Sequence, residues 1–195
     1  MRRLILLSLT ALLTLSACAR PGGPEPAAAT TTAATTTATG RASTGDHTAV
    51  LIAVLRRYLT TPGENSFSDP FAHAYVFDFT DAGAADPMAA TPHQPVALPA
   101  DEQAAIIDGL ADLSTVRFIA DRAEVVVTSP DDPCGSMPPG AILMTLGEPQ
   151  GTADRVEVGV SGWVSCLGAT WLTYVVERDG AQWRVTGTTG PMAIA

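Results

Sequence analysis

The chain has 195 residues, which is room for one domain of ordinary size together with extensions. It carries 11 basic residues against 20 acidic ones, and its formal net charge is −9. Nucleic-acid binding needs a basic surface, so we expect no nucleic-acid partner. All the basic residues are Arg, and the absence of Lys excludes a P-loop or a Schiff-base lysine.

The first 18 residues have the layout of an export signal. Arg2 and Arg3 precede an apolar run of about a dozen residues, 4–15, which is too short to span a bilayer. The run ends in Leu15-Ser16-Ala17-Cys18. This stretch resembles the lipobox of bacterial lipoproteins, and the Arg-only, Ala-rich and Thr-rich composition resembles uncharacterised actinobacterial lipoproteins.

The lipobox resemblance implies a signal peptide at 1–17, which is removed, and a lipidated Cys18 at the new N-terminus. Acyl chains such as palmitate would then hold the protein on the extracytoplasmic face of the cell membrane. The alternative is an ordinary secretory signal that contains an incidental cysteine. We expect residues 18–46, rich in Pro, Ala and Thr, to be a disordered linker without an apolar face.

Residues 47–195 are predicted to form a single domain. Apolar residues at helical spacing predict a helix at 47–60 with Asp46 as its N-cap, and a second helix that opens at Pro99. The buried stripe of the second helix is expected to contain Ile106, Leu110 and Leu113, with Ile107 alongside. A strand is predicted at 72–80, and a long exposed loop at 81–95.

From residue 116 onward the apolar period changes to two, which is typical of strands. A hairpin is expected at 116–119 and 124–128, turning at Asp121-Arg122, followed by a Pro-rich loop. Four further strands are predicted, the last two joined at Asp179-Gly180: 141–146, 155–166, 170–178 and 182–187.

This order predicts an α+β fold in which two helices pack on one face of a curved, mostly antiparallel sheet. The closing strands run Tyr174-Val175-Val176-Glu177-Arg178-Asp179-Gly180 and then Trp183-Arg184-Val185. In element order and in these strands the chain resembles the cystatin-like and NTF2-like cone folds.

Two cysteines remain besides Cys18. An exported domain favours a disulfide between Cys134 and Cys166. The alternative is a pair of reduced, buried thiols.

One strand face carries the only arrangement that suggests a pocket. His73, Tyr75 and Phe77 share that face, where NTF2-like enzymes place an acid or a base. A hydrogen-bonded histidine at the edge of the core is the plainer interpretation. His47 and His93 are expected to be solvated side chains.

Other motifs do not indicate a site. Gly159-Val160-Ser161-Gly162 lies inside a predicted strand, and Gly187-Thr188-Thr189-Gly190 is expected to be a strand end. The aspartates at 78, 81, 86, 131 and 132 lack the spacing of a calcium loop, and the three tryptophans are expected to pack on the sheet. We expect no metal and no cofactor.

These observations predict an exported, membrane-anchored cell-envelope lipoprotein whose domain binds an unknown envelope protein or small molecule without catalysis. Two alternatives remain open. One is an NTF2-like enzyme with a His73-containing pocket, and the other is a carrier of an apolar small molecule or lipid.

Overall fold

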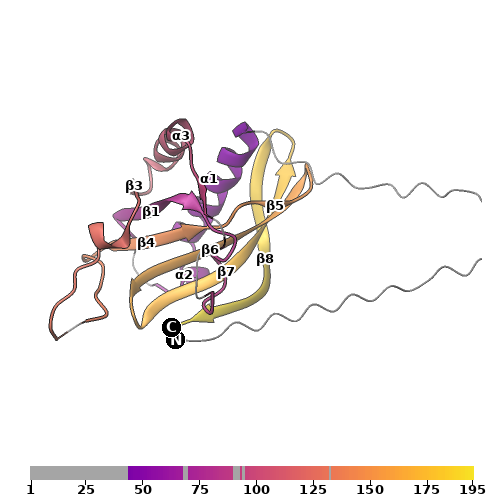
Figure 1. The fold of residues 1–195 in the computed structure, drawn as a ribbon. Coiled ribbons are helices and arrows are strands. Elements are labelled where there is room, and N and C mark those ends of the chain that lie inside the picture. The colour runs from indigo at the N-terminus through magenta and orange to yellow at the C-terminus, as the bar shows by residue number, and fades with distance from the viewer. Residues whose placement is uncertain (1–43, 68–69, 90–92, 94, 132) are drawn as a thin grey trace, which may run out of the picture. The chain divides into compact units, whose positions relative to one another are not determined.

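The computed structural model describes residues 44–195 apart from 68–69, 90–92, 94 and 132 (Figure 1). The predicted signal peptide, Cys18 and most of the predicted linker lie outside the described residues.

The described elements comprise three α-helices, one 3₁₀ turn (η1) and eight strands. In chain order they are α1 (Thr44–Thr60), α2 (Pro62–Asn65), β1 (His73–Thr80), β2 (Val96–Ala97), α3 (Ala100–Leu110), β3 (Thr115–Ile119), η1 (Arg122–Glu124), β4 (Ala141–Leu146), β5 (Gln150–Gly151), β6 (Arg155–Ser165), β7 (Gly168–Asp179) and β8 (Gln182–Ile194).

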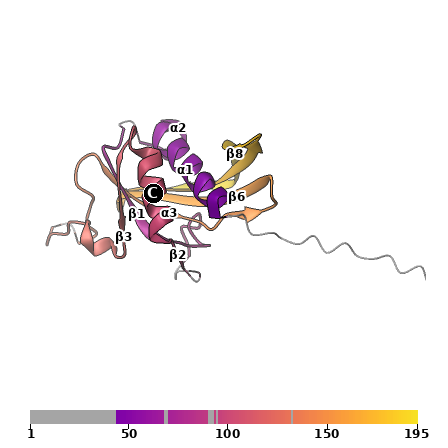
Figure 2. The same cartoon turned by 90° about the horizontal axis from the view of Figure 1, so that it is seen from above.

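The strands form one mixed sheet, mostly antiparallel, in the order β2-β1-β4-β6-β7-β8. β3 also pairs with β1, and β5 pairs with β6. α1 packs on β7 and β8, and it lies beside α3 in the view from above (Figure 2). The predicted α+β class is confirmed.

α1 supplies the helical half of the main core. Val50, Leu51, Val54, Leu55 and Tyr58 are fully buried, at the spacing that places residues on one helical face. They pack against the inward residues of the sheet strands, whose alternation gives one buried face. The sequence pattern of α1 is therefore explained by this packing.

The start of α1 differs from the prediction. The helix begins at Thr44, so Asp46 lies in its first turn and is no N-cap. The Asp46 carboxylate instead accepts a 3.1 Å hydrogen bond from Trp183 Nε1 and lies 2.6 Å from an Arg178 guanidinium nitrogen. Asp46 thus binds two residues that are distant in sequence instead of capping the helix. Because α1 begins at Thr44, the folded part starts before residue 47.

α3 follows the prediction closely at its start. Pro99 is its N-cap residue, and Ile106 and Leu110 are fully buried. Ile107, expected alongside them, is instead 39% exposed, and Leu113 lies past the helix end while still packing against the core.

The predicted hairpin at 116–128 is wrong. β3 pairs in parallel with β1, and α3 connects the two strands. A crossover helix allows the second strand to run parallel to the first. Beyond β3 the chain turns into η1, where the Asp121 side chain caps Ala123 N and the Glu124 side chain bonds back to Asp121 N.

The turn at Asp179-Gly180 is confirmed, because β7 and β8 pair on either side of it. β8 runs on to Ile194, so the stretch at 187–190 lies within the strand and does not end it, contrary to the prediction. Gly190 has φ of +68°, which suits glycine, and Pro191 is tolerated because β8 is an edge strand.

Candidate functional site

The structure does not gather the predicted pocket of His73, Tyr75 and Phe77. β1 turns Ala74 and Val76 into the main core, and both are fully buried. Tyr75 and Phe77 lie on the opposite face and pack against a second, smaller cluster that includes Val125 and Met137. His73, the first residue of β1, is exposed. The segment after η1 packs against these two aromatics, while His73 stays exposed to solvent, and none of the hollows described below is lined by His73, Tyr75 or Phe77.

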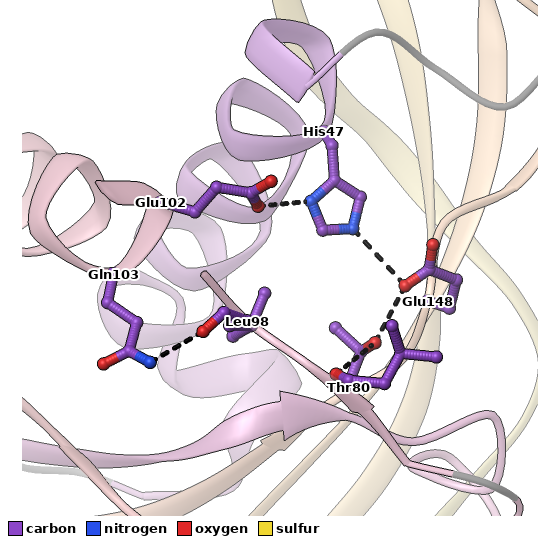
Figure 3. A network of polar contacts seen from close by, with 7 residues as sticks. His47, Thr80, Leu98, Glu102, Gln103 and Glu148 are labelled. Atoms are coloured by element: carbon purple, nitrogen blue, oxygen red, sulfur yellow. Dashed lines mark hydrogen bonds and ion pairs between the residues drawn. The ribbon is translucent and has the colours of Figure 1, made fainter. Parts of the chain in front are cut away.

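His47, expected to be solvated, is instead enclosed. Its side chain is only 14% exposed and lies between two carboxylates (Figure 3). Nδ1 lies 2.7 Å from Glu102 Oε2, and Nε2 lies 3.4 Å from Glu148 Oε2. The first contact is a hydrogen bond, and the second is an ion-pair contact longer than a good hydrogen bond. We call these three residues the His47 bridge.

Four elements position the His47 bridge. His47 lies in the first turn of α1, and Glu102 in the first turn of α3, where an acidic side chain is favoured by the helix dipole. Glu148 follows β4, and Thr80 at the end of β1 donates a 2.8 Å hydrogen bond to its Oε2. The bridge therefore joins both long helices to the sheet.

A close backbone approach brings Glu148 to this place. Gly147 N donates a 2.7 Å hydrogen bond to Gly159 O on β6. A Cβ atom at Gly147 would lie 2.9 Å from Gly159 N, which is too close, so glycine is required at this point.

The bridge favours a protonated imidazole. The Glu148 carboxylate, together with Glu102, raises the pKa of His47 above 6.5, while burial opposes the shift. In the protonated ring both nitrogens carry a hydrogen. Nδ1 is hydrogen-bonded to Glu102, and Nε2 lies in an ion-pair contact with Glu148 without a hydrogen bond. The bridge is thus a cation held between two anions.

This geometry limits the chemistry of His47. Nδ1 is occupied by its hydrogen bond to Glu102, and Nε2 is buried beside Glu148, where a substrate or metal in solvent does not reach it. The two carboxylates lie on opposite sides of the ring and do not converge on a single ion. Within the described ranges no group of three His, Cys, Asp or Glu side chains could hold a metal.

Surface hollows adjoin the core, and two of them bear on function. A groove of about 410 Å³ lies between α1 and α3 next to the His47 bridge, and it is lined by Gly45, Thr48, Ala49, Ile52, Asp101, Glu102 and Ala105. A second hollow of about 340 Å³ is mostly apolar and is lined by Phe67, Pro70, Phe71, Met137, Pro138, Pro139, Gly140, Ala141 and Val164.

The structure brings Cys134 and Cys166 together as a disulfide pair. Their Cα atoms lie 6.0 Å apart, within the range of bonded cysteines. Ser136 bridges to Ser165 beside them, so the Pro-rich loop is pinned to the end of β6.

The other residues singled out in the sequence lie outside the His47 bridge. His93 is exposed, and its backbone N–H donates to Asp81 Oδ1 at 2.9 Å. Ser161 lies within β6, opposite Thr145 and Trp171. Trp183 is buried, whereas Trp163 and Trp171 are half-buried.

No helix in the described part of the chain is both long and apolar enough to cross a membrane. Comparisons with models of known protein families, with curated proteins and with solved structures find no match to this chain. The cystatin-like or NTF2-like resemblance therefore stays a prediction.

Proposed function

We propose that the protein is an exported lipoprotein of the bacterial cell envelope, anchored in the membrane through Cys18, whose folded domain binds a partner without catalysis. One observation carries the proposal. The basic start, the short apolar run and Leu15-Ser16-Ala17-Cys18 follow one another in the order that lipoprotein processing requires.

Two features of the folded domain support this proposal. The pairing of Cys134 with Cys166 suits an oxidising compartment outside the cytoplasm, where disulfides persist. His47, whose side chain is 14% exposed, has both ring nitrogens facing carboxylates, as a structural bridge would.

The test is fractionation of cells that make the full chain. We expect the parent to float with membranes and Cys18→Ser to lose both lipid labelling and cleavage after Ala17. Ser16→Ala is the matched control, because it changes the same segment while keeping a small residue, and it should remain lipidated. Unchanged cleavage and membrane attachment of Cys18→Ser would refute the proposal.

A second candidate function is a carrier for a small apolar molecule. The hollow lined by Phe67, Phe71 and Val164 favours it, since its 340 Å³ lies at the lower end of ligand-pocket volumes. Native mass spectrometry of the purified full chain tests this candidate. A co-purifying apolar ligand that is lost in Val164→Asp supports it, and an empty protein counts against it.

A further inference from the structure

One end of the sheet collects several strand ends. β1 and β4 begin there together, because His73 pairs with Ala141. β6 ends and β7 begins at the same end, and the end of β8 returns to it, with Thr170 opposite Ile194. Figure 1 shows the C-terminus at this end of the sheet.

Apolar side chains are exposed at this end. Leu167 is 89% exposed at the two-residue turn between β6 and β7, and Ile194 is 59% exposed. Two-residue hairpin turns favour Asn, Asp or Gly, because these residues adopt the backbone conformation that the turn needs. Leu has no such preference, so turn formation does not explain Leu167. Its neighbour Cys166 is bonded to Cys134, which holds the turn in place.

The apolar hollow lies at the same end. It is lined by Val164 near the end of β6 and by Pro138 and Pro139 just before β4. Met137 N donates a 2.8 Å hydrogen bond to Val164 O, which joins the two segments. We call the surface made of Phe67, Pro138, Pro139, Val164, Leu167 and Ile194 the apolar tip.

Charge is separated along the strands. At this end β4, β6, β7, β8 and the turns next to them carry no charged side chain over 133–147, 158–176 and 185–194. The other end, around β5 and the β7–β8 turn, carries Asp154, Arg155, Glu157, Glu177, Arg178, Asp179 and Arg184. These four strands thus carry their charged side chains away from the apolar tip, and a cation that does lie near this end is Arg122 of η1, which stacks 4.5 Å from the ring centre of Trp163.

We propose that the apolar tip docks on the lipid bilayer that holds the acyl anchor. The inference rests on the proposed anchoring at Cys18. Uncharged aliphatic side chains such as Leu167 and Ile194 partition into the boundary between headgroups and acyl chains. At the charged end, acidic side chains slightly outnumber basic ones, and anionic lipid repels a negative surface. The apolar tip is therefore the end that faces the membrane.

The length of chain before α1 permits this orientation. α1 starts at the charged end of the sheet, where Asp46 contacts Arg178 and Trp183. β7 has 12 residues and spans about 40 Å from the charged end to the tip. Residues 19–43 number 25 and reach at most about 85 Å when fully extended. The anchor can therefore sit in the bilayer on which the tip rests.

The test uses the full lipidated chain in vesicles of phosphatidylcholine and phosphatidylglycerol whose acyl chains carry bromine, a short-range quencher of tryptophan. We expect Leu167→Trp to show fluorescence quenched at least about twofold more than that of the parent. Met88→Trp is the matched control, because Met88 is 84% exposed but follows Thr80 at the other end of β1. Equal quenching in the two variants overturns the docking.

A shortened linker provides a second measurement. Deletion of residues 25–39 leaves 10 residues between Cys18 and α1, which reach about 34 Å, less than the length of β7. In this background Leu167→Trp should still float with the vesicles but lose its extra quenching. Retained quenching contradicts the proposed geometry.

The remaining outcomes separate the two proposals. A chain that does not float with vesicles overturns both the anchoring and the docking. A chain that floats without extra quenching of Leu167→Trp overturns the docking alone. Dimers that Leu167→Asp converts to monomers would identify a second copy as the occupant of the tip, and would also overturn docking on lipid.

Discussion

His47 Nδ1 lies 2.7 Å from Glu102 Oε2, which joins the first turns of α1 and α3 across 55 positions of sequence. Glu148 closes the other side of the same ring. The two contacts together link α1 and α3 to the loop after β4, and two predictions rest on them.

Removal of the imidazole should destabilise the fold. His47→Ala leaves Glu102 and Glu148 largely buried without their cation, and we expect a loss of about 2 kcal/mol in the free energy of unfolding. Urea denaturation of the variant measures it. His93→Ala, at an exposed position, should change stability by less than about 0.5 kcal/mol. Equal effects of the two substitutions would show that the bridge contributes nothing.

The stabilisation by His47 should depend on pH. Its pKa is raised in the folded state above the ordinary value of 6.5, so the folded protein binds the proton more tightly. The contribution is complete below pH 6.5 and is lost as the pH rises through the raised folded-state pKa. The difference in free energy of unfolding between the parent and His47→Gln should therefore shrink above that pKa. A difference that grows with pH contradicts the prediction.

The Asp46 carboxylate should contribute to holding α1 against the β7–β8 hairpin. It accepts from Trp183 Nε1 and pairs with Arg178, whose guanidinium stacks 4.5 Å from the Trp183 ring centre. Asp46→Ala is expected to cost about 1 kcal/mol and to change the fluorescence of Trp183. Asp154→Ala removes a longer contact of 3.5 Å from the same Arg178 at an 80% exposed side chain. It should leave both readouts nearly unchanged, and an equal loss would refute the specific role of Asp46.

Gly162 should not tolerate a side chain. A Cβ atom there would lie 2.1 Å from the Tyr58 hydroxyl, which is hydrogen-bonded to buried Thr170. Gly162→Ala is expected to cost about 1–3 kcal/mol, because the Tyr58 ring must move out of a packed core. Gly187→Ala is the control, since nothing lies within 4 Å of its Cβ position. Thermal unfolding compares the two, and similar melting temperatures would contradict the packing described.

Loss of the Cys134–Cys166 bond should destabilise the domain. The bond closes a loop of 32 residues, for which chain entropy gives about 3–4 kcal/mol. The double variant Cys134→Ser/Cys166→Ser should unfold at a correspondingly lower urea concentration. Thiol labelling of the parent in denaturant should find both cysteines blocked until a reductant is added. Labelling without reductant would show that the bond is absent.

Local patterns were sufficient to predict much of the fold. The apolar stripe of α1, the alternation of β1 and the Asp179-Gly180 turn are each determined by neighbours in sequence, and the structure confirms them. The predicted hairpin is wrong because β3 pairs with β1, across a helix, and not with the segment that follows it. Two-residue alternation identifies a strand but not its partner.

The candidate site could not be predicted in the same way. His47 and Glu148 are 101 positions apart, and no motif spacing links them to Glu102. The sequence shows acidic residues in the first turn of α3, but there they indicate only a favourable interaction with the helix dipole and not a partner for His47. His73 shares its strand face with Tyr75 and Phe77, which are half-buried, but His73 itself is exposed.

The anchoring at Cys18 is most directly tested by the intact mass of the mature protein extracted from membranes. We predict a chain that begins at Cys18 and carries the added mass of a diacylglyceryl group. A mature chain that begins elsewhere, or that has an unmodified Cys18 and is found in the soluble fraction, would contradict this account.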